Sequence, residues 1–406
     1  MKEYDYIIIG AGISGLTVAE QLQGTNHLVI ERENQVGGYC RTIMQDGYIW
    51  DYAGHFFHFR EKSELHSFEK IFSKSEYVKV TKKSKIVYKN KMISYPFQDN
   101  IHELDANEFK ECAEGLKNTK VKAEYSSFLD MLYSKYGSGI VDKFLKPYNE
   151  KLYVCNLEQL DVNAMGRFFP SNIAEKSNKK STSYNEQFYY LLNGSGYYIQ
   201  KIAYDKKKVV KNCQVAKIDI ENKILKTVGG ENYKYRTLVS TIPLNSLMTI
   251  CGINSKIKMT YNKVLVFNIG FDSKTEVKDC HWLYVPDKTI NFYRVGFYDN
   301  VVPNNRGSIY VEIAFAEKQV INIETEFKSV IEGLKKIGII KTQKIVSYNY
   351  IIMNPGYVHV NQKSYIDALC HALEKHDVYS IGRYGSWTYN SMEDCIIEAK
   401  KIAKKL

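Results

Sequence analysis

Three glycines near the N-terminus have the spacing of a phosphate-binding turn. Residues 6–9 are an apolar run, residues 10–15 read Gly-Ala-Gly-Ile-Ser-Gly, and a helical pattern follows. Gly10 allows a tight turn out of the strand, Gly12 lets a pyrophosphate approach the backbone, and Gly15 lets the helix pack closely on the sheet. The helix N-terminus then points at the phosphates. The motif therefore predicts a dinucleotide site; the alternative is an ordinary turn of a βαβ unit.

The residues that follow narrow the choice of dinucleotide. A predicted strand over residues 27–30 ends at Glu31, about 20 residues after the first glycine, where a carboxylate can bind ribose hydroxyls. Arg-x-x-x-x-Gly-Gly then follows, which resembles the extended signature of FAD-binding oxidases and mutases. Its glycine pair allows a second close backbone approach, and Arg41 can pair with phosphate; the alternative is a Gly-Gly turn with a solvated arginine. The FAD candidates are Gly10, Gly12, Ser14, Gly15, Glu31, Arg32, Gly38, Tyr39, Arg41, Gly382, Arg383 and Met392.

Later blocks resemble one family within this group, the UDP-galactopyranose mutases. Residues 382–394 read Gly-Arg-Tyr-Gly-Ser-Trp-Thr-Tyr-Asn-Ser-Met-Glu-Asp and are similar to the family's C-terminal signature. Residues 55–58 resemble its His-x-Phe-His near the flavin, and residues 144–153 resemble its nucleotide-site helix. Residues 160–170 and 292–295 resemble two arginine-bearing blocks. Only these later blocks distinguish the mutases from other flavoproteins, because amine oxidases and protoporphyrinogen oxidases share the FAD motifs.

The resemblance implies a mutase that interconverts the pyranose and furanose forms of a nucleotide sugar. Reduced FAD would attack the anomeric carbon through N5 and displace the nucleoside diphosphate; the sugar ring would then open and reclose. No net redox change occurs, so the cofactor carries the chemistry while the protein supplies orientation and charge. An external reductant such as NAD(P)H would charge the flavin, and a homodimer is one option for assembly.

Departure of a diphosphate requires fixed cations, and the arginine fork matches phosphate. The resemblance assigns this task to Arg383 and Arg294, with Arg167 as a further candidate and Tyr389 as a hydroxyl donor to the same phosphates. An arginine at the end of a strand is otherwise often a salt-bridge partner.

Two histidines and two tyrosines complete the candidate site. His55 or His58 would lie against the flavin and hold its reduced, anionic ring. Tyr148 and Tyr153 would sandwich the base or the sugar. All four side chains could instead be packed core, since they lie in aromatic or amphipathic segments.

Three positions depart from the mutase pattern. Ser171 stands where the family commonly has a second arginine, Tyr153 where it has Trp, and Lys263 where an arginine would be expected. The expected substrate is therefore a nucleotide sugar, and the sequence specifies neither its base nor its sugar. Residues 171–186 are polar and could form a lid or an inert surface loop.

The periodicity predicts an α/β protein: a Rossmann-like FAD-binding domain with a helical insert and an antiparallel β-sheet substrate domain. Residues 76–97 alternate and are expected to form a hairpin within the insert. The predicted segments are FAD-binding parts at 1–75, 193–255 and 361–406, a helical and hairpin insert at 76–192, and the substrate sheet at 256–360.

Composition excludes several other classes. The 406 residues carry a net charge of +11, but lysine is spread along the chain, so no face concentrated enough for nucleic acid is expected. The eight cysteines form no Cys-x-x-Cys pair and read as reduced thiols, so no metal site is expected. No apolar stretch approaches the ~20 residues of a membrane span. With a strand at the very start, we expect a cytoplasmic protein.

Two rival functions remain open at this point. An FAD oxidoreductase of the amine oxidase or protoporphyrinogen oxidase type would take hydride from a substrate into oxidised flavin. A flavin- or nucleotide-binding protein without catalysis would lack an open sugar pocket lined by arginines.

Overall fold

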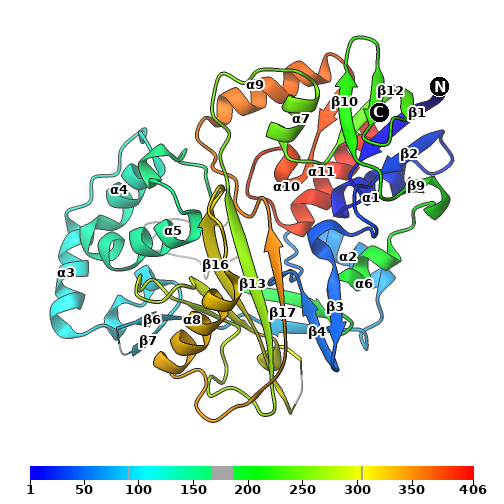
Figure 1. The fold of residues 1–406 in the computed structure, drawn as a ribbon. Coiled ribbons are helices and arrows are strands. Elements are labelled where there is room, and N and C mark those ends of the chain that lie inside the picture. Colours follow the sequence, from blue (N-terminus) through cyan, green and yellow to red (C-terminus); the bar gives the residue numbers. More distant parts are fainter. Residues whose placement is uncertain (90, 166–185, 303–304) are drawn as a thin grey trace.

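Two seven-stranded sheets organise the chain (Figure 1). The computed structural model describes residues 1–89, 91–165, 186–302 and 305–406. Blue, green and red segments of the ribbon meet around the first sheet, so residues from both ends of the chain build one layer. The predicted α/β architecture is confirmed.

The first sheet is the Rossmann-like part. Its strand order is β10-β11-β12-β1-β2-β9, and β18 pairs with β12. Strand β1 lies parallel to β2 and β12, and its residues Ile7–Ile9 are buried. Such apolar runs are expected where helices cover both faces of a parallel sheet. The strands are β1 (Lys2–Ile9), β2 (His27–Ile30), β9 (Val209–Val210), β10 (Val215–Asp219), β11 (Ile224–Thr227), β12 (Asn232–Ser240) and β18 (Val378–Ser380).

Helices from both ends of the chain cover this sheet. The nine-residue α1 packs with α11 in one apolar cluster that includes Leu16, Ile396 and Ala399. The helices around this sheet are α1 (Ile13–Gln21), α2 (Lys62–Ile71), α6 (Gly196–Lys201), α7 (Leu244–Ile250), α9 (Lys363–Glu374), α10 (Gly382–Gly385) and α11 (Met392–Lys405).

The second sheet is antiparallel except where β14 meets β6, and its order is β17-β13-β16-β15-β14-β6-β7. Helix α8 (Ile323–Lys336) packs through Val330 and Leu334 against the apolar side chains of one face. The strands are β6 (Ser84–Tyr88), β7 (Lys91–Ser94), β13 (Asn262–Phe271), β14 (Trp282–Tyr284), β15 (Arg294–Phe297), β16 (Gly307–Ala316) and β17 (Ile345–Met353). The predicted antiparallel sheet is thus present and also recruits the β6–β7 pair.

The expected hairpin over residues 76–97 is only partly present. Strands β6 and β7 form a hairpin, but β5 (Tyr77–Thr81) pairs with β8 (Gln187–Leu191) instead. The alternating pattern gives the strands but not their partners, because pairing depends on segments far away in sequence. The five segment boundaries given above stay a prediction.

A helical segment flanks the second sheet (Figure 1). This segment consists of α3 (Ala106–Lys117), α4 (Phe128–Ile140) and α5 (Lys146–Tyr153). A separate hairpin is formed by β3 (Thr42–Gln45) and β4 (Tyr48–Asp51). In the part of the chain that the structure describes, no helix has the length and apolar character needed to cross a membrane.

Candidate cofactor and substrate site

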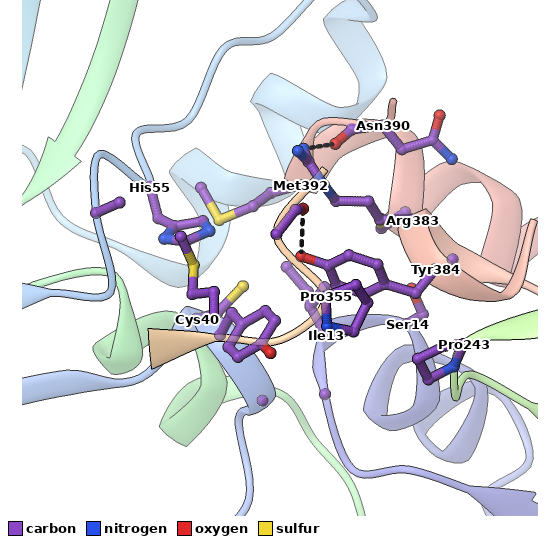
Figure 2. A pocket seen from close by; sticks show the side chains of 18 of the residues that line it. Ile13, Ser14, Cys40, His55, Pro243, Pro355, Arg383, Tyr384, Asn390 and Met392 are labelled. Carbon is purple, nitrogen blue, oxygen red and sulfur yellow. Dashed lines mark hydrogen bonds between the residues drawn. The ribbon is translucent and has the colours of Figure 1, made fainter. Parts of the chain in front are cut away.

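One cavity of about 680 Å³ brings together residues from both sheets and from α5. Figure 2 shows part of it, with His55 and Arg383 on opposite sides and Met392 between them. Most of the residues singled out from the sequence line this cavity: Gly10, Gly12, Ser14, Glu31, Arg32, Gly38, Tyr39, Arg41, His55, His58, Tyr148, Arg294, Gly382, Arg383, Tyr389 and Met392.

The glycine turn forms one wall. Gly10 has φ +96°, and a Cβ there would lie 2.3 Å from the Thr241 hydroxyl oxygen. Gly15 does not line the cavity; a Cβ on it would lie 2.0 Å from the Gly10 carbonyl oxygen. Both positions therefore exclude a side chain for packing reasons. Gly12 differs, because a Cβ there would meet only the Gly38 Cα at 3.9 Å.

Glu31 is fixed beside this turn. Its carboxylate accepts hydrogen bonds from the Ala11 N–H at 2.7 Å and from the Glu33 N–H at 2.9 Å. Arg41 donates from Nε to the Gly38 carbonyl at 2.7 Å, whereas Arg32 pairs with Glu33 at the surface. The loop of the glycine pair is thus held against the first glycine turn.

These features fit a bound FAD. Gly12 caps α1 without any side-chain hydrogen bond, so the helix N-terminus presents backbone N–H groups and no competing acceptor. Gly12 leaves open space at the cavity wall, where a pyrophosphate can approach. Glu31 lies beside this turn, where the acidic residue of the motif binds the ribose hydroxyls of a dinucleotide.

His55 adds a buried, unsatisfied polar atom on the cavity side. Among the described residues, its Nδ1 has no hydrogen-bond partner. Burial and the charge of Arg383 lower the pKa of His55 to about 4, so the imidazole is neutral at pH 7. A neutral ring can accept or donate one hydrogen bond to a flavin. His58 lies in the same wall, with its Nδ1 3.2 Å from the Gln187 carbonyl.

Arg383 is on α10 and lies across the cavity from His55 (Figure 2). Its guanidinium donates to the Asn390 carbonyl at 3.0 Å and lies 4.4 Å from the centre of the Tyr389 ring. Among the described residues, no carboxylate pairs with it. A cation held by a carbonyl and an aromatic ring keeps its charge available to an anionic ligand.

Arg294 is also in the cavity wall, but its charge is already compensated. Its Nη2 lies 2.8 Å from Glu312 Oε1, and Nε contacts Oε2, so the pair is bidentate. The Glu312 side chain is only 1% exposed and the Arg294 side chain 19%. The salt-bridge alternative considered for a strand-end arginine is therefore present here.

We expect Glu312→Gln to destabilise the fold by about 3 kcal/mol, because removing one partner of a buried pair leaves the other charge uncompensated. Urea unfolding would measure the change. Glu61→Gln breaks an exposed pair with Arg60 and is the matched control, expected to cost about 0–1 kcal/mol. Equal costs for the two variants would show that the buried pair is not important for stability.

The two tyrosines of α5 have different environments. Tyr148 lines the cavity and stacks on Phe144, with ring centres 5.3 Å apart. Tyr153 does not line it; it is 1% exposed and its hydroxyl lies 3.3 Å from the Ala164 carbonyl. The helix thus turns the Tyr153 side chain into the core beside the cavity wall, and its role at the substrate stays a prediction.

Other cavity residues were not apparent from the sequence. Lys82, Tyr95, Tyr284 and Tyr357 all line the cavity. Lys82 belongs to no motif, and its neighbours Thr81 and Lys83 suggest only a polar loop that connects two strands. Tyr357 follows Asn-Pro-Gly, a turn signal that could have marked a loop at the site.

Arg167 lies outside the described residues, and so does all of the polar segment 171–186 except its last residue. The expectations for both stay predictions.

Comparison with known proteins supports the same assignment of the fold. Residues 8–69 match the model of an NAD(P)-binding Rossmann-like domain. Protoporphyrinogen oxidase 2 of Arabidopsis thaliana is 48% identical over 46 residues, which are 11% of this chain and 9% of that enzyme. The match to this curated relative thus spans less than a tenth of its length.

Two solved structures resemble the chain over nearly its whole length. The first, of reduced UDP-galactopyranose mutase, has a TM-score of 0.87 at 22% identity and covers 99% of this chain and 93% of that one. The second, of a protein described as a putative protoporphyrinogen oxidase from Exiguobacterium sp. 255-15, has a TM-score of 0.79 at 16% identity, with 100% and 98% covered. The chain therefore has the fold of this group of flavoproteins, and its resemblance to UDP-galactopyranose mutase is confirmed at the level of the fold.

Proposed function

We propose that the protein is a flavoenzyme that uses reduced FAD to interconvert the pyranose and furanose forms of a nucleoside diphosphate sugar. The observation that carries the proposal is Arg383, a cation without a paired carboxylate among the described residues, in the same cavity as the glycine turn. An FAD oxidase acting on a neutral donor has no need of such a cation opposite the flavin wall. A nucleotide sugar brings its diphosphate there.

In this proposal, separate residues of the chain bind the cofactor and the substrate. The N-terminus of α1 binds the FAD diphosphate and Glu31 its ribose. Arg383 binds the substrate diphosphate and stabilises the charge that develops as it leaves. Tyr389 lies beside Arg383, where it can contact the same phosphates. Reduced FAD would supply the nucleophile, N5, for the anomeric carbon, and an external reductant such as NAD(P)H would keep it reduced.

The test is a product assay on the purified protein under anaerobic conditions. After reduction with dithionite, we expect at least one sugar from a panel of UDP-, GDP- and dTDP-pyranoses to give a furanose signal by NMR. The oxidised protein is the control and is expected to give none. Product that forms equally with oxidised flavin, or no product from any sugar, would contradict the proposal.

An FAD-dependent oxidoreductase is the second candidate, and one feature of the cavity favours it. Arg294 is neutralised by Glu312, and the cavity wall is rich in aromatic hydroxyls, as an oxidase site for an uncharged donor could be. The tyrosines in the wall are Tyr39, Tyr95, Tyr148, Tyr261, Tyr284, Tyr357, Tyr384 and Tyr389. Bleaching of oxidised flavin by an amine or another donor, without furanose formation, would establish this alternative.

A further inference from the structure

Lys82 is a second cation in the wall of the cavity. It follows β5 and lines the cavity, half-buried. Its Nζ lies 5.4 Å from the ring centre of Tyr95 and 5.3 Å from that of Trp282. Among the described residues, no carboxylate forms an ion pair with it. Two aromatic faces thus hold an ammonium group whose hydrogen-bond donors remain available to a ligand.

The charges in the substrate part of the cavity suggest what the ligand is. Away from the FAD turn, the charged side chains that the described residues contribute to the wall are Lys82, Arg294, Glu312 and Arg383. Arg294 and Glu312 cancel, so Lys82 and Arg383 remain. The diphosphate of a nucleotide sugar carries two negative charges, one on each phosphate, and these two cations would balance them.

We propose that Lys82 and Arg383 together bind the substrate diphosphate. The proposal rests on the proposed function, to whose diphosphate site it adds Lys82 as a second cation. Lys82 supplies a second cation for the diphosphate, because Arg294 is occupied by Glu312.

The contact of Lys82 with Tyr95 agrees with this role. Tyr389 lies against Arg383, and the electrostatic interactions of Tyr95 include Tyr389 as well as Arg294. Tyr95 beside Lys82 and Tyr389 beside Arg383 therefore link the two cations through interacting tyrosines. A ligand that spans these tyrosines can reach both cations.

Binding should then depend on pH. Burial, together with the charge of Arg294, lowers the pKa of Lys82 to about 8. Lys82 is charged below that pH and neutral above it, so a diphosphate binds more weakly as the pH rises through 8. The polar and aromatic groups that face Lys82 are Arg294 on β15 with Glu312 on β16, Tyr284 and Trp282 on β14, Tyr95 after β7, and His58. Burial raises the pKa of Tyr95, and raises that of Tyr284 to about 12, so neither tyrosine titrates in this range.

The experiment measures the dissociation constants of UDP, GDP and dTDP with the reduced, FAD-loaded protein between pH 7.5 and 9.5. This range lies above the second phosphate pKa of about 6, so the ligand charge stays constant. At pH 7.5 we expect Lys82→Met to weaken binding about 10- to 100-fold, as for the loss of a hydrogen bond to a charged group. Lys82→Arg should retain tight binding at pH 9.5, where the wild-type protein has lost it, because arginine stays charged.

Lys83→Met is the matched control. Lys83 is the next residue, but its Nζ points to Asp279 at 3.3 Å and it does not line the cavity. Its binding constants and pH dependence should equal those of the wild type.

The outcomes separate this proposal from the proposed function. Lys82-dependent diphosphate binding without furanose from any sugar would support the inference and overturn the mutase activity. Furanose formation by the wild type with unchanged binding in Lys82→Met would overturn the inference alone. A pH step that persists in Lys82→Arg would belong to another group and would also overturn it. Failure of all three diphosphates to bind the wild type would overturn both.

Discussion

Arg383→Ala is expected to lower the turnover per bound FAD by about 10²-fold or more. The guanidinium is held by the Asn390 carbonyl and the Tyr389 ring, with no paired carboxylate among the described residues, so its charge is available to the proposed diphosphate. Loss of a charged donor aimed at developing negative charge costs about 10²–10³ in rate. The measurement is the steady-state rate of furanose formation under anaerobic reduction.

The control for this variant is Arg306→Ala. Arg306 also lies over a tyrosine ring, that of Tyr48 at 3.9 Å, but it is not part of the cavity wall. Its loss removes an arginine–tyrosine contact without touching the ligand, so turnover should stay near that of the wild type. If Arg383→Ala kept near-normal turnover, or if both variants lost activity equally, Arg383 would have no role in charge stabilisation.

The part of the site that sequence predicts well is the part encoded by consecutive residues. The turn from Gly10 to Gly15, Glu31 and the loop around Gly38 need only a strand, a turn and a helix to be placed, and all three are local. The same holds for Gly382 and Arg383, which follow the short strand β18. A Cβ on Gly382 would lie 2.7 Å from the Ser14 hydroxyl oxygen, so the C-terminal motif meets the N-terminal one directly.

The substrate side depends on contacts between distant segments, and there the sequence is less informative. Arg294 has the type and position of a phosphate ligand, but Glu312 on the neighbouring strand neutralises it, a pairing set by strand register. Lys82 reaches the cavity because β5 pairs with β8 and β6 joins the second sheet. Tyr153 lies five residues after Tyr148, a separation that turns its side chain toward a different face of the helix.

Gly12→Ala is expected to weaken FAD binding about 10²-fold without destabilising the protein itself. An alanine Cβ at this position would make only an ordinary contact with the Gly38 Cα at 3.9 Å, and Gly12 has φ −80°, which any residue adopts. The fold therefore tolerates the methyl group. The pyrophosphate of the proposed FAD would not tolerate it, because it would need the same space to approach the N-terminus of α1. Hydrogen bonds to charged groups contribute about 1.5–3 kcal/mol each, so losing one or two accounts for that factor.

The contrast with Gly15→Ala makes this test specific. At Gly15 the added Cβ would lie 2.0 Å from the Gly10 carbonyl oxygen, so that variant should lose both FAD and stability. Gly229→Ala lies outside the cavity, where the Cβ meets only the end of the Glu231 side chain, and should lose neither. Flavin titration by fluorescence and urea unfolding of the FAD-free proteins separate the two effects. If Gly12→Ala bound FAD as tightly as the wild type, the pyrophosphate would not cross the N-terminus of α1, because no other feature of Gly12 makes its lack of a side chain necessary.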